Sequence, residues 1–222
     1  MFGTLADTVS VVGELAAACG DRAAEVARAW RRKQVEYMVR VTAMGQFPPF
    51  ADLTSWGLVG ALAEHGFSLP EAQTDQLLGA YRRLRPFDDV RPAVQALHER
   101  GDSIVVFSVG PRAWLEELTG SYRQFVDGIV SAEEVGAYKP HPAIYRHLLD
   151  TTKTEPAAAL LVSSNPFDVI GAASVGLRTA WCRRDPSAIF DPWGPRPDHV
   201  ITGLAGLADV LPPPRRASGS DT

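Results

Sequence analysis

Two short segments in the second half of the sequence place a lysine and several polar side chains where catalytic groups could act. Lys139 precedes Pro140, and a residue before proline is held in an extended backbone. Ser163, Asn165 and Asp168 follow an apolar run typical of a buried strand. An ammonium group can stabilise developing negative charge, and hydroxyl, amide and carboxylate groups can orient water. The structural alternatives are a solvated lysine, with Asn165 capping the next helix and Asp168 complementing its dipole.

Ser108 is a further candidate because it ends the short apolar run SIVVFS. The Gly-Pro pair that follows it opens a predicted helix, whose free N–H groups would attract an anion. The hydroxyl could therefore bind substrate beside those N–H groups. The alternative is that Ser108 only caps the helix.

Arg31 lies in an otherwise apolar row of a predicted helix, which includes Val35. No acidic residue stands three or four positions from it, so no partner is available on its own helix. A cation in this setting predicts an anion from outside the helix, unless the side chain only covers apolar surface on its way to solvent. Arg32, by contrast, has Glu36 four residues on and is expected to pair with it.

The elements that position these residues fall into two parts. Residues 22–44 lack Gly and Pro and carry a largely apolar row at helical spacing, and further helices are expected over 53–64 and 70–84. Beyond position 86 short apolar strands alternate with helices, which predicts βαβ units and a parallel sheet. The expected strands are 103–108, 128–132, 158–164, 178–182 and 199–202. Sites in such sheets lie outside the carboxyl ends of the strands, where the candidate residues stand.

The composition is that of a globular protein, with 45% hydrophobic and 22% charged residues among 222. The net charge of −4 gives no basic excess to attract nucleic acid or an anionic membrane. No apolar run approaches the length of a membrane span, and the N-terminus lacks the pattern of a signal peptide. The two cysteines, Cys19 and Cys182, exclude a disulfide scaffold and a cysteine zinc site and predict reduced thiols in a cytoplasmic protein.

Four motifs follow one another along the chain. They are FGTL at 2–5, WRRKQVEY at 30–37, KPHPAIY at 139–145 and VSSNPFD at 162–168. Together they resemble the motifs of the haloacid dehalogenase superfamily, and more narrowly those of the type II (S)-2-haloacid dehalogenases. The resemblance implies an α/β fold with a Rossmann-like, parallel-sheet core and a helical cap inserted after the first strand.

The resemblance also implies how the chain is divided. We expect a remnant of the first core motif at 1–7, the cap at 8–85, the α/β core at 86–211 and a disordered tail at 212–222. It implies no cofactor and no metal. The expected partners are a small 2-haloacid and a second copy of the chain in a homodimer, with no nucleic acid or membrane.

The mechanism implied by the resemblance uses an Asp of the first motif. This carboxylate would displace the halide from the substrate carbon with inversion, and water would hydrolyse the aspartyl ester. Thr4 would steady the Asp, and Lys139 would hold its charge. Ser163, Asn165 and Asp168 would orient the lysine and the water. The supporting residue of this network would be Tyr145.

The resemblance assigns the remaining residues to the substrate. Ser108 would bind its carboxylate and Arg31 would receive the leaving halide. The apolar pocket would be lined by Phe2, Val35, Phe50 and Phe167. Val109 stands where the subfamily usually has an Asn that donates near the halide, so weak activity is expected.

One departure concerns the nucleophile. The superfamily pattern places the Asp one position before Met1, and the strand that carries it earlier still. We therefore expect the natural chain to begin further upstream, and we expect the chain that starts at Met1 to be inactive.

Two other functions remain open at this stage. A magnesium phosphatase of the same superfamily would carry a second Asp where Phe2 stands and an acidic metal ligand where Ser164 stands. A non-catalytic binding protein on the same fold would need no nucleophile at all.

Overall fold

The computed structural model describes residues 1–213, and the first part of this chain is helical. Its helices are α1 (Val12–Cys19), α2 (Ala23–Ala43), α3 (Phe50–Glu64) and α4 (Glu71–Tyr81). The helix α2 ends just before Gly45, whose φ of 67° is a conformation that favours glycine. The helix α3 begins at Phe50, three residues before the predicted start, because Pro49 takes the N-cap position rather than lying in a loop.

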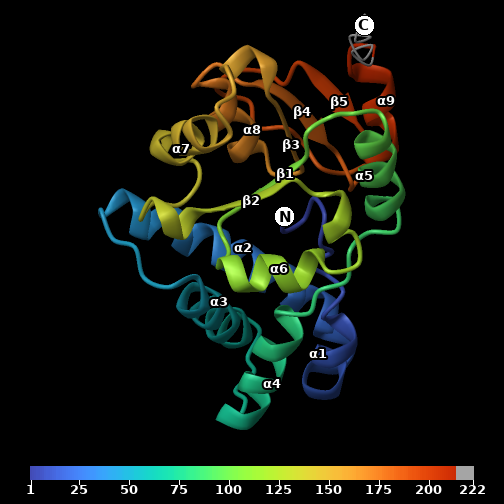
Figure 1. The fold of residues 1–222 in the computed structure, drawn as a ribbon. Coiled ribbons are helices and arrows are strands. Elements are labelled where there is room, and N and C mark those ends of the chain that lie inside the picture. Colours follow the sequence, from blue (N-terminus) through green and yellow to red (C-terminus); the bar gives the residue numbers. More distant parts are fainter. Residues whose placement is uncertain (214–222) are drawn as a thin grey trace, which may run out of the picture.

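The second part alternates strands and helices, as the sequence predicts. Its elements are α5 (Val90–Glu99), β1 (Val105–Ser108), α6 (Arg112–Thr119), β2 (Gly128–Ser131), α7 (Pro142–Thr152), β3 (Leu160–Ser163), α8 (Pro166–Ala173), β4 (Arg178–Cys182), β5 (His199–Ile201) and α9 (Leu207–Val210). Helices α1, α3 and α4 lie at one end of the molecule and β3, β4 and β5 at the other (Figure 1). Most of the predicted tail, residues 214–222, lies outside the described residues.

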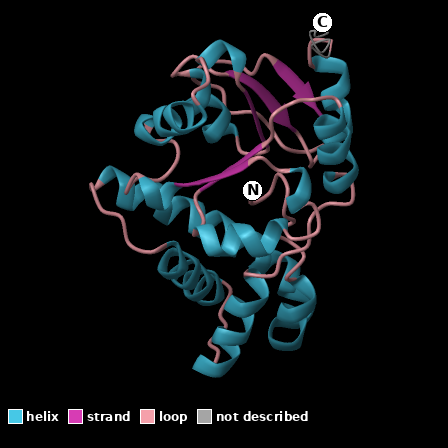
Figure 2. Ribbon diagram, in the orientation of Figure 1, coloured by secondary structure: helices cyan, strands magenta, loops and turns pink. Residues whose placement is uncertain are grey.

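All strand pairings within the sheets are parallel, which confirms the predicted α/β class. The described strands form a pair, β1–β2, and a separate three-stranded sheet in the order β3–β4–β5, with helices packed around both (Figure 2). The last residues of β1 and β2 are both serines, and Ser108 lies opposite Ser131. The candidate residues after β1 and β3 therefore stand at the carboxyl ends of two neighbouring sheets.

The N-terminal turn connects these two strand ends. The backbone N–H of Ser164 donates to Thr4 Oγ1 at 2.9 Å, just after β3. Gly110, just after β1, lies so close to the Phe2 ring that an added Cβ would stand 3.0 Å from it. The turn itself needs Gly3, whose φ is 81°.

The helical part is joined to the rest through two chain segments that lie side by side. The N–H of Asp7 donates to the carbonyl of Arg85 at 2.8 Å, and the N–H of Phe87 donates to the carbonyl of Leu5 at 3.0 Å. Both ends of the segment between them are therefore fixed at one place. No helix in the described residues is long and apolar enough to cross a membrane.

The helical part is held by apolar packing in which Leu58 of α3 takes part. This side chain is fully buried, whereas that of its neighbour Val59 is 54% exposed. Substitutions at these two neighbouring positions therefore compare a buried and an exposed side chain in the same helix.

We expect Leu58→Ala to lower the free energy of unfolding by about 2–5 kcal/mol, because it removes buried methyl groups and leaves a cavity. The matched control Val59→Ala should change it by less than about 0.5 kcal/mol. Urea denaturation of both variants measures this. Equal losses would mean that α3 does not bury the face described here.

Candidate active site

A buried ion pair stands at the centre of the candidate site. The ammonium of Lys139 lies 3.1 Å from the carboxylate of Asp168 at the start of α8, and both residues are only 5% exposed. The same ammonium donates to the carbonyl of Phe107 in β1 at 3.3 Å. It also lies 3.6 Å from the centre of the Phe107 ring, within reach of a cation–π contact. Lys139 thus connects the end of β1 to the start of α8 and is not the solvated lysine of the structural alternative.

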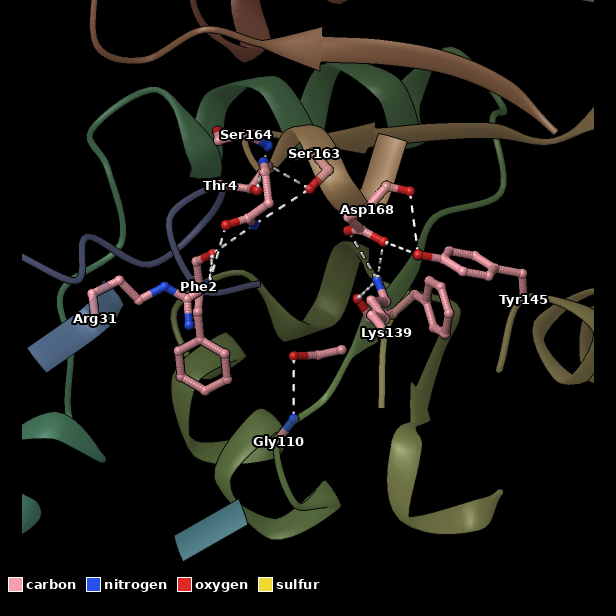
Figure 3. Close-up of polar contacts among 12 residues, drawn as sticks. Phe2, Thr4, Arg31, Gly110, Lys139, Tyr145, Ser163, Ser164 and Asp168 are labelled. Atoms are coloured by element: carbon pink, nitrogen blue, oxygen red, sulfur yellow. Dashed lines mark hydrogen bonds and ion pairs between the residues drawn. The ribbon is translucent and has the colours of Figure 1, made fainter. Parts of the chain in front are cut away.

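Burial sets the protonation of this pair and of its neighbour. Removal from water lowers the pKa of Lys139, and the Asp168 carboxylate opposes that shift. Burial also raises the pKa of Tyr145, so its hydroxyl keeps its proton. That hydroxyl lies 2.9 Å from Asp168 Oδ1, to which it donates, and both Lys139 and Tyr145 point at Asp168 (Figure 3). The carboxylate therefore has a donor on each side.

The residues after β3 face the N-terminal turn. Asn165 occupies the N-cap position of α8, yet its side chain makes no cap hydrogen bond. Its amide nitrogen donates instead to the carbonyl of Phe2 at 3.3 Å, and its backbone N–H donates to Ser163 Oγ at 3.2 Å. The capping alternative accounts for the position of Asn165 but not for its side chain, which is directed to the site.

Arg31 of α2 reaches the same place from the helical part. Its guanidinium donates to Gln34 Oε1 at 2.8 Å, to Asn165 Oδ1 at 3.2 Å and to the carbonyl of Phe2 at 3.5 Å. Each of these acceptors is a neutral oxygen. A cation held among neutral acceptors is able to bind an anionic ligand, as its place in the apolar row predicts.

The neighbouring Arg32 differs from its prediction. It forms an exposed ion pair with Glu64 of α3, while Glu36 pairs with Arg40. The expected pair with Glu36 is therefore wrong. The helix α3 lies close enough to α2 to offer a carboxylate from outside the helix, which helical spacing alone does not reveal.

The amino group of Met1 is buried at this site, although the residue as a whole is only half-buried. Burial, together with the charges of Lys139 and Arg31, lowers the pKa of the Met1 amino group to about 5, against the opposing charge of Asp168. The Met1 nitrogen is therefore within electrostatic reach of Lys139, Arg31 and Asp168.

Aromatic rings close the other side of the site. Phe2 stacks on Phe50 with ring centres 5.2 Å apart, and Val109 is buried nearby after β1. Val35 and Phe167 are partly buried against the same apolar cluster. Phe2, Phe50 and Val109 thus belong to one apolar cluster, and Val35 and Phe167 pack against it.

Ser108 is buried at the end of β1, and its Oγ accepts from the N–H of Gly110 at 3.5 Å. It does not cap α6, because Pro111 holds the N-cap position and no side chain caps that helix. The structure places its hydroxyl at the carboxyl end of β1, where the prediction requires it.

Two polar contacts escaped the sequence analysis. Arg184, just after β4, donates to the carbonyl of Thr4 at 2.8 Å and pairs with Asp89 at 2.9 Å. Gln34 of α2 holds Arg31. The sequence signal for Gln34 is an amide in a largely apolar row, whereas nothing in the sequence pattern links Arg184 to Asp89. Within residues 1–213, no group of three or more His, Cys, Asp or Glu side chains is placed to hold a metal ion.

Comparison with known proteins agrees with this geometry. The family model of haloacid dehalogenase-like hydrolases matches residues 1–176, and the chain belongs to this family. Among its relatives is (S)-2-haloacid dehalogenase 2 of Pseudomonas sp. (strain CBS-3), which is 32% identical over 95% of this chain and 93% of that protein. Haloacetate dehalogenase H-2 of Moraxella sp. (strain B) is also 32% identical, over 95% of each chain.

Solved structures give the same result. The L-2-haloacid dehalogenase of Xanthobacter autotrophicus with chloropropionic acid covalently bound superposes with a TM-score of 0.86 at 26% identity, covering 94% of each chain. The (S)-2-haloacid dehalogenase relatives and this structure confirm the resemblance read from the four motifs.

The buried lysine gives a test of the pair. Because the pKa of Lys139 is lowered in the folded state, the unfolded chain binds this proton more tightly. The contribution of Lys139 to the free energy of unfolding should therefore rise as the pH increases from the lowered pKa towards 10.5. We expect the stability of the wild type relative to Lys139→Met to increase between about pH 7 and about pH 10. Denaturation by urea at several pH values measures it.

The exposed Lys153 supplies the control for this experiment. The rise with pH expected for Lys139→Met is judged against the change measured for Lys153→Met, which removes an ammonium from an exposed position. If the difference in the free energy of unfolding between the wild type and Lys139→Met stays constant or falls as the pH rises, the lowered pKa of Lys139 is contradicted.

Proposed function

We propose that this protein hydrolyses the carbon–halogen bond of short (S)-2-haloalkanoic acids and releases (R)-2-hydroxy acids and halide without a metal. The observation that carries the proposal is the convergence of Lys139, Asp168 and Arg31 on the N-terminal turn. The similarity to (S)-2-haloacid dehalogenases over 95% of the chain supports it.

The reaction needs a carboxylate beside Lys139, and we propose that an Asp directly before Met1 supplies it. The burial of the Met1 nitrogen next to Lys139 supports this position. One oxygen of that carboxylate forms a bond to the substrate carbon while the carbon–halogen bond breaks, which inverts the configuration and releases halide. Water then adds to the carbonyl of the ester and the alcohol leaves, which regenerates the carboxylate and releases one proton.

The polar residues have distinct roles in these steps. Lys139 holds the nucleophile in its ionised form and stabilises the oxyanion of ester hydrolysis. Asp168 keeps Lys139 charged and in place, and Tyr145 holds Asp168 by its hydroxyl. Ser163 and Asn165 orient the water, while Thr4 steadies the nucleophile.

The substrate is held by the groups around these residues. Ser108 and nearby backbone N–H groups bind its carboxylate, and Arg31 receives the departing halide, because both partners then carry complementary charge. The apolar part of the substrate lies against Phe2, Val35, Phe50 and Phe167. Val109 offers no donor to the halide, so the rate should be low.

We also propose a division into two domains, a homodimer and a cytoplasmic location for this protein. We assign the cap to residues 8–85 and the core to 86–211, which puts Arg31 on the cap and Lys139 on the core. A homodimer rests on the resemblance alone. A cytoplasmic location is supported by Cys19 and Cys182, which are both free and buried.

Two proteins test the reaction: the 222-residue chain and the same chain preceded by an apolar strand that ends in Asp directly before Met1. We expect the second to release chloride from (S)-2-chloropropanoate, with EDTA having no effect, and the first to release almost none. Aryl phosphates should not be hydrolysed with or without Mg²⁺, because Phe2 and Ser164 stand where a magnesium phosphatase carries its second Asp and an acidic metal ligand. Ion chromatography and a phosphate assay measure the products.

Equal chloride release by the two proteins would show that the nucleophile does not precede Met1. Magnesium-dependent phosphate release without halide release would replace the dehalogenase with a phosphatase. No turnover of either substrate class would favour the non-catalytic binding protein.

Substitution of the neighbouring residues Arg31 and Arg32 compares an arginine of the site with an arginine on the surface. In the protein with the added Asp, Arg31→Lys should lower kcat/KM by about a hundred- to a thousandfold, because one ammonium cannot replace a fork of donors. The control Arg32→Lys should be nearly silent, since Arg32 is exposed and paired with Glu64. Steady-state halide release measures both, and similar losses would show that Arg31 has no special role.

A further inference from the structure

Gln34 of α2 is a buried amide that lies one helical turn after Arg31. Its residue is only 1% exposed, and every polar atom of its side chain has a partner. Oε1 accepts from Arg31 Nη1 and from the Tyr81 hydroxyl, both at 2.8 Å, and Nε2 donates to Thr54 Oγ1 at 2.7 Å. A buried amide with all its partners in place is held in a single orientation.

The partners of Gln34 are themselves fixed. Thr54 Oγ1 donates to the carbonyl of Phe50 at 2.8 Å, so its proton is already used and it must accept from Gln34. Burial raises the pKa of Tyr81, so the phenol keeps the proton that it donates. An amide turned the other way would direct its NH₂ group at the donors of Arg31 and Tyr81. The oxygen of Gln34 therefore faces Arg31.

The backbone around Gln34 supports the same arrangement. The helix α3 lies close to the backbone of α2 at Gly57, where an added Cβ would stand 3.1 Å from the backbone nitrogen of Gln34 and 3.3 Å from its Cα. The absence of a side chain at Gly57 thus brings α3 close, and Thr54, one turn earlier on α3, reaches the amide.

From these contacts we propose that Gln34 is the positioning residue of Arg31, and that it must be a neutral acceptor. This inference rests on the proposed role of Arg31 in receiving an anion. The oxygen of Gln34 holds one end of the guanidinium, and Asn165 Oδ1 and the carbonyl of Phe2 hold the other. A carboxylate in place of the amide would hold the guanidinium as well, but it would neutralise the charge that the anion needs.

The variant Gln34→Glu isolates this point because it keeps the size of the side chain and adds one charge. The control Gln73→Glu adds the same charge at an exposed site in the first turn of α4, where an acid is favourable. The probe is bromide, and isothermal titration calorimetry on the 222-residue chain gives its Kd. We expect Gln34→Glu to raise this Kd by about tenfold or more and Gln73→Glu to change it by less than about twofold.

A double-mutant cycle shows whether Gln34 acts through Arg31. In an Arg31→Lys background, Gln34→Glu should change the bromide Kd by less than about twofold, because the group that it positions is gone. A residue with a purely structural role would give the same loss in both backgrounds. If Gln34→Glu does not fold, Thr54→Val removes the acceptor of Nε2 and should weaken bromide binding only when Arg31 is present.

The outcomes separate this inference from the proposed function. Loss of bromide binding that depends on Arg31, together with no halide release from haloacids by the protein with the added Asp, would uphold the role of Gln34 and overturn the dehalogenase. Halide release by the protein with the added Asp, together with an unchanged bromide Kd in Gln34→Glu, would do the reverse. Equal losses with and without Arg31, or no bromide binding by the wild type, would overturn the inference.

Discussion

The removal of Lys139 and Asp168 from water is the constraint on which the rest of the site depends. An isolated ammonium or carboxylate in such a place would cost several kcal/mol, on the order of the net stability of a domain. The pair is retained because the carbonyl of Phe107 and the hydroxyl of Tyr145 complete its hydrogen bonds. These groups come from separate strands and helices, so the elements must meet to within hydrogen-bond distance. The dry surroundings then keep the field between the charges strong.

The same constraint explains how far the sequence predicts the site. Strand and helix positions follow from the spacing of apolar residues, and parallel pairing follows from their alternation. Ser108, Lys139 and Asp168 could be placed together because each follows or precedes a strand end at one edge of a parallel arrangement. The division of the described strands into two sheets does not follow from these patterns, because apolar spacing locates strands without showing which of them are neighbours.

The sequence does not predict which side chains pair with each other between elements. Arg32 has an acid at helical spacing, yet a carboxylate on a neighbouring helix is its partner. Arg184 and Asp89 are 95 positions apart, and only the folded chain brings them together at the carbonyl of Thr4. Gln34 stands out in the sequence only as an amide in a largely apolar row, since its partners Thr54 and Tyr81 lie on two other helices. The spacing of apolar residues shows which face of a helix or strand is buried. Hydrogen bonds between elements depend on crossing angles and distances, which this spacing does not give.

The two chain segments that join the helical part to the rest, residues 5–7 and 85–87, lie side by side, and this affects how the chain can vary. Asp7 and Arg85 are joined by a backbone hydrogen bond of 2.8 Å, so the chain leaves and re-enters the strand-bearing part at nearly the same point. A segment with adjoining ends can be lengthened, shortened or exchanged without redirecting the path of the remaining chain. Arg31 and Gln34 travel with that segment, while Lys139 and Asp168 do not. The groups assigned to the leaving anion and those assigned to the nucleophile therefore lie on different parts of the chain, and a change in either part must preserve the hydrogen bonds of Arg31 to Asn165 and to the carbonyl of Phe2.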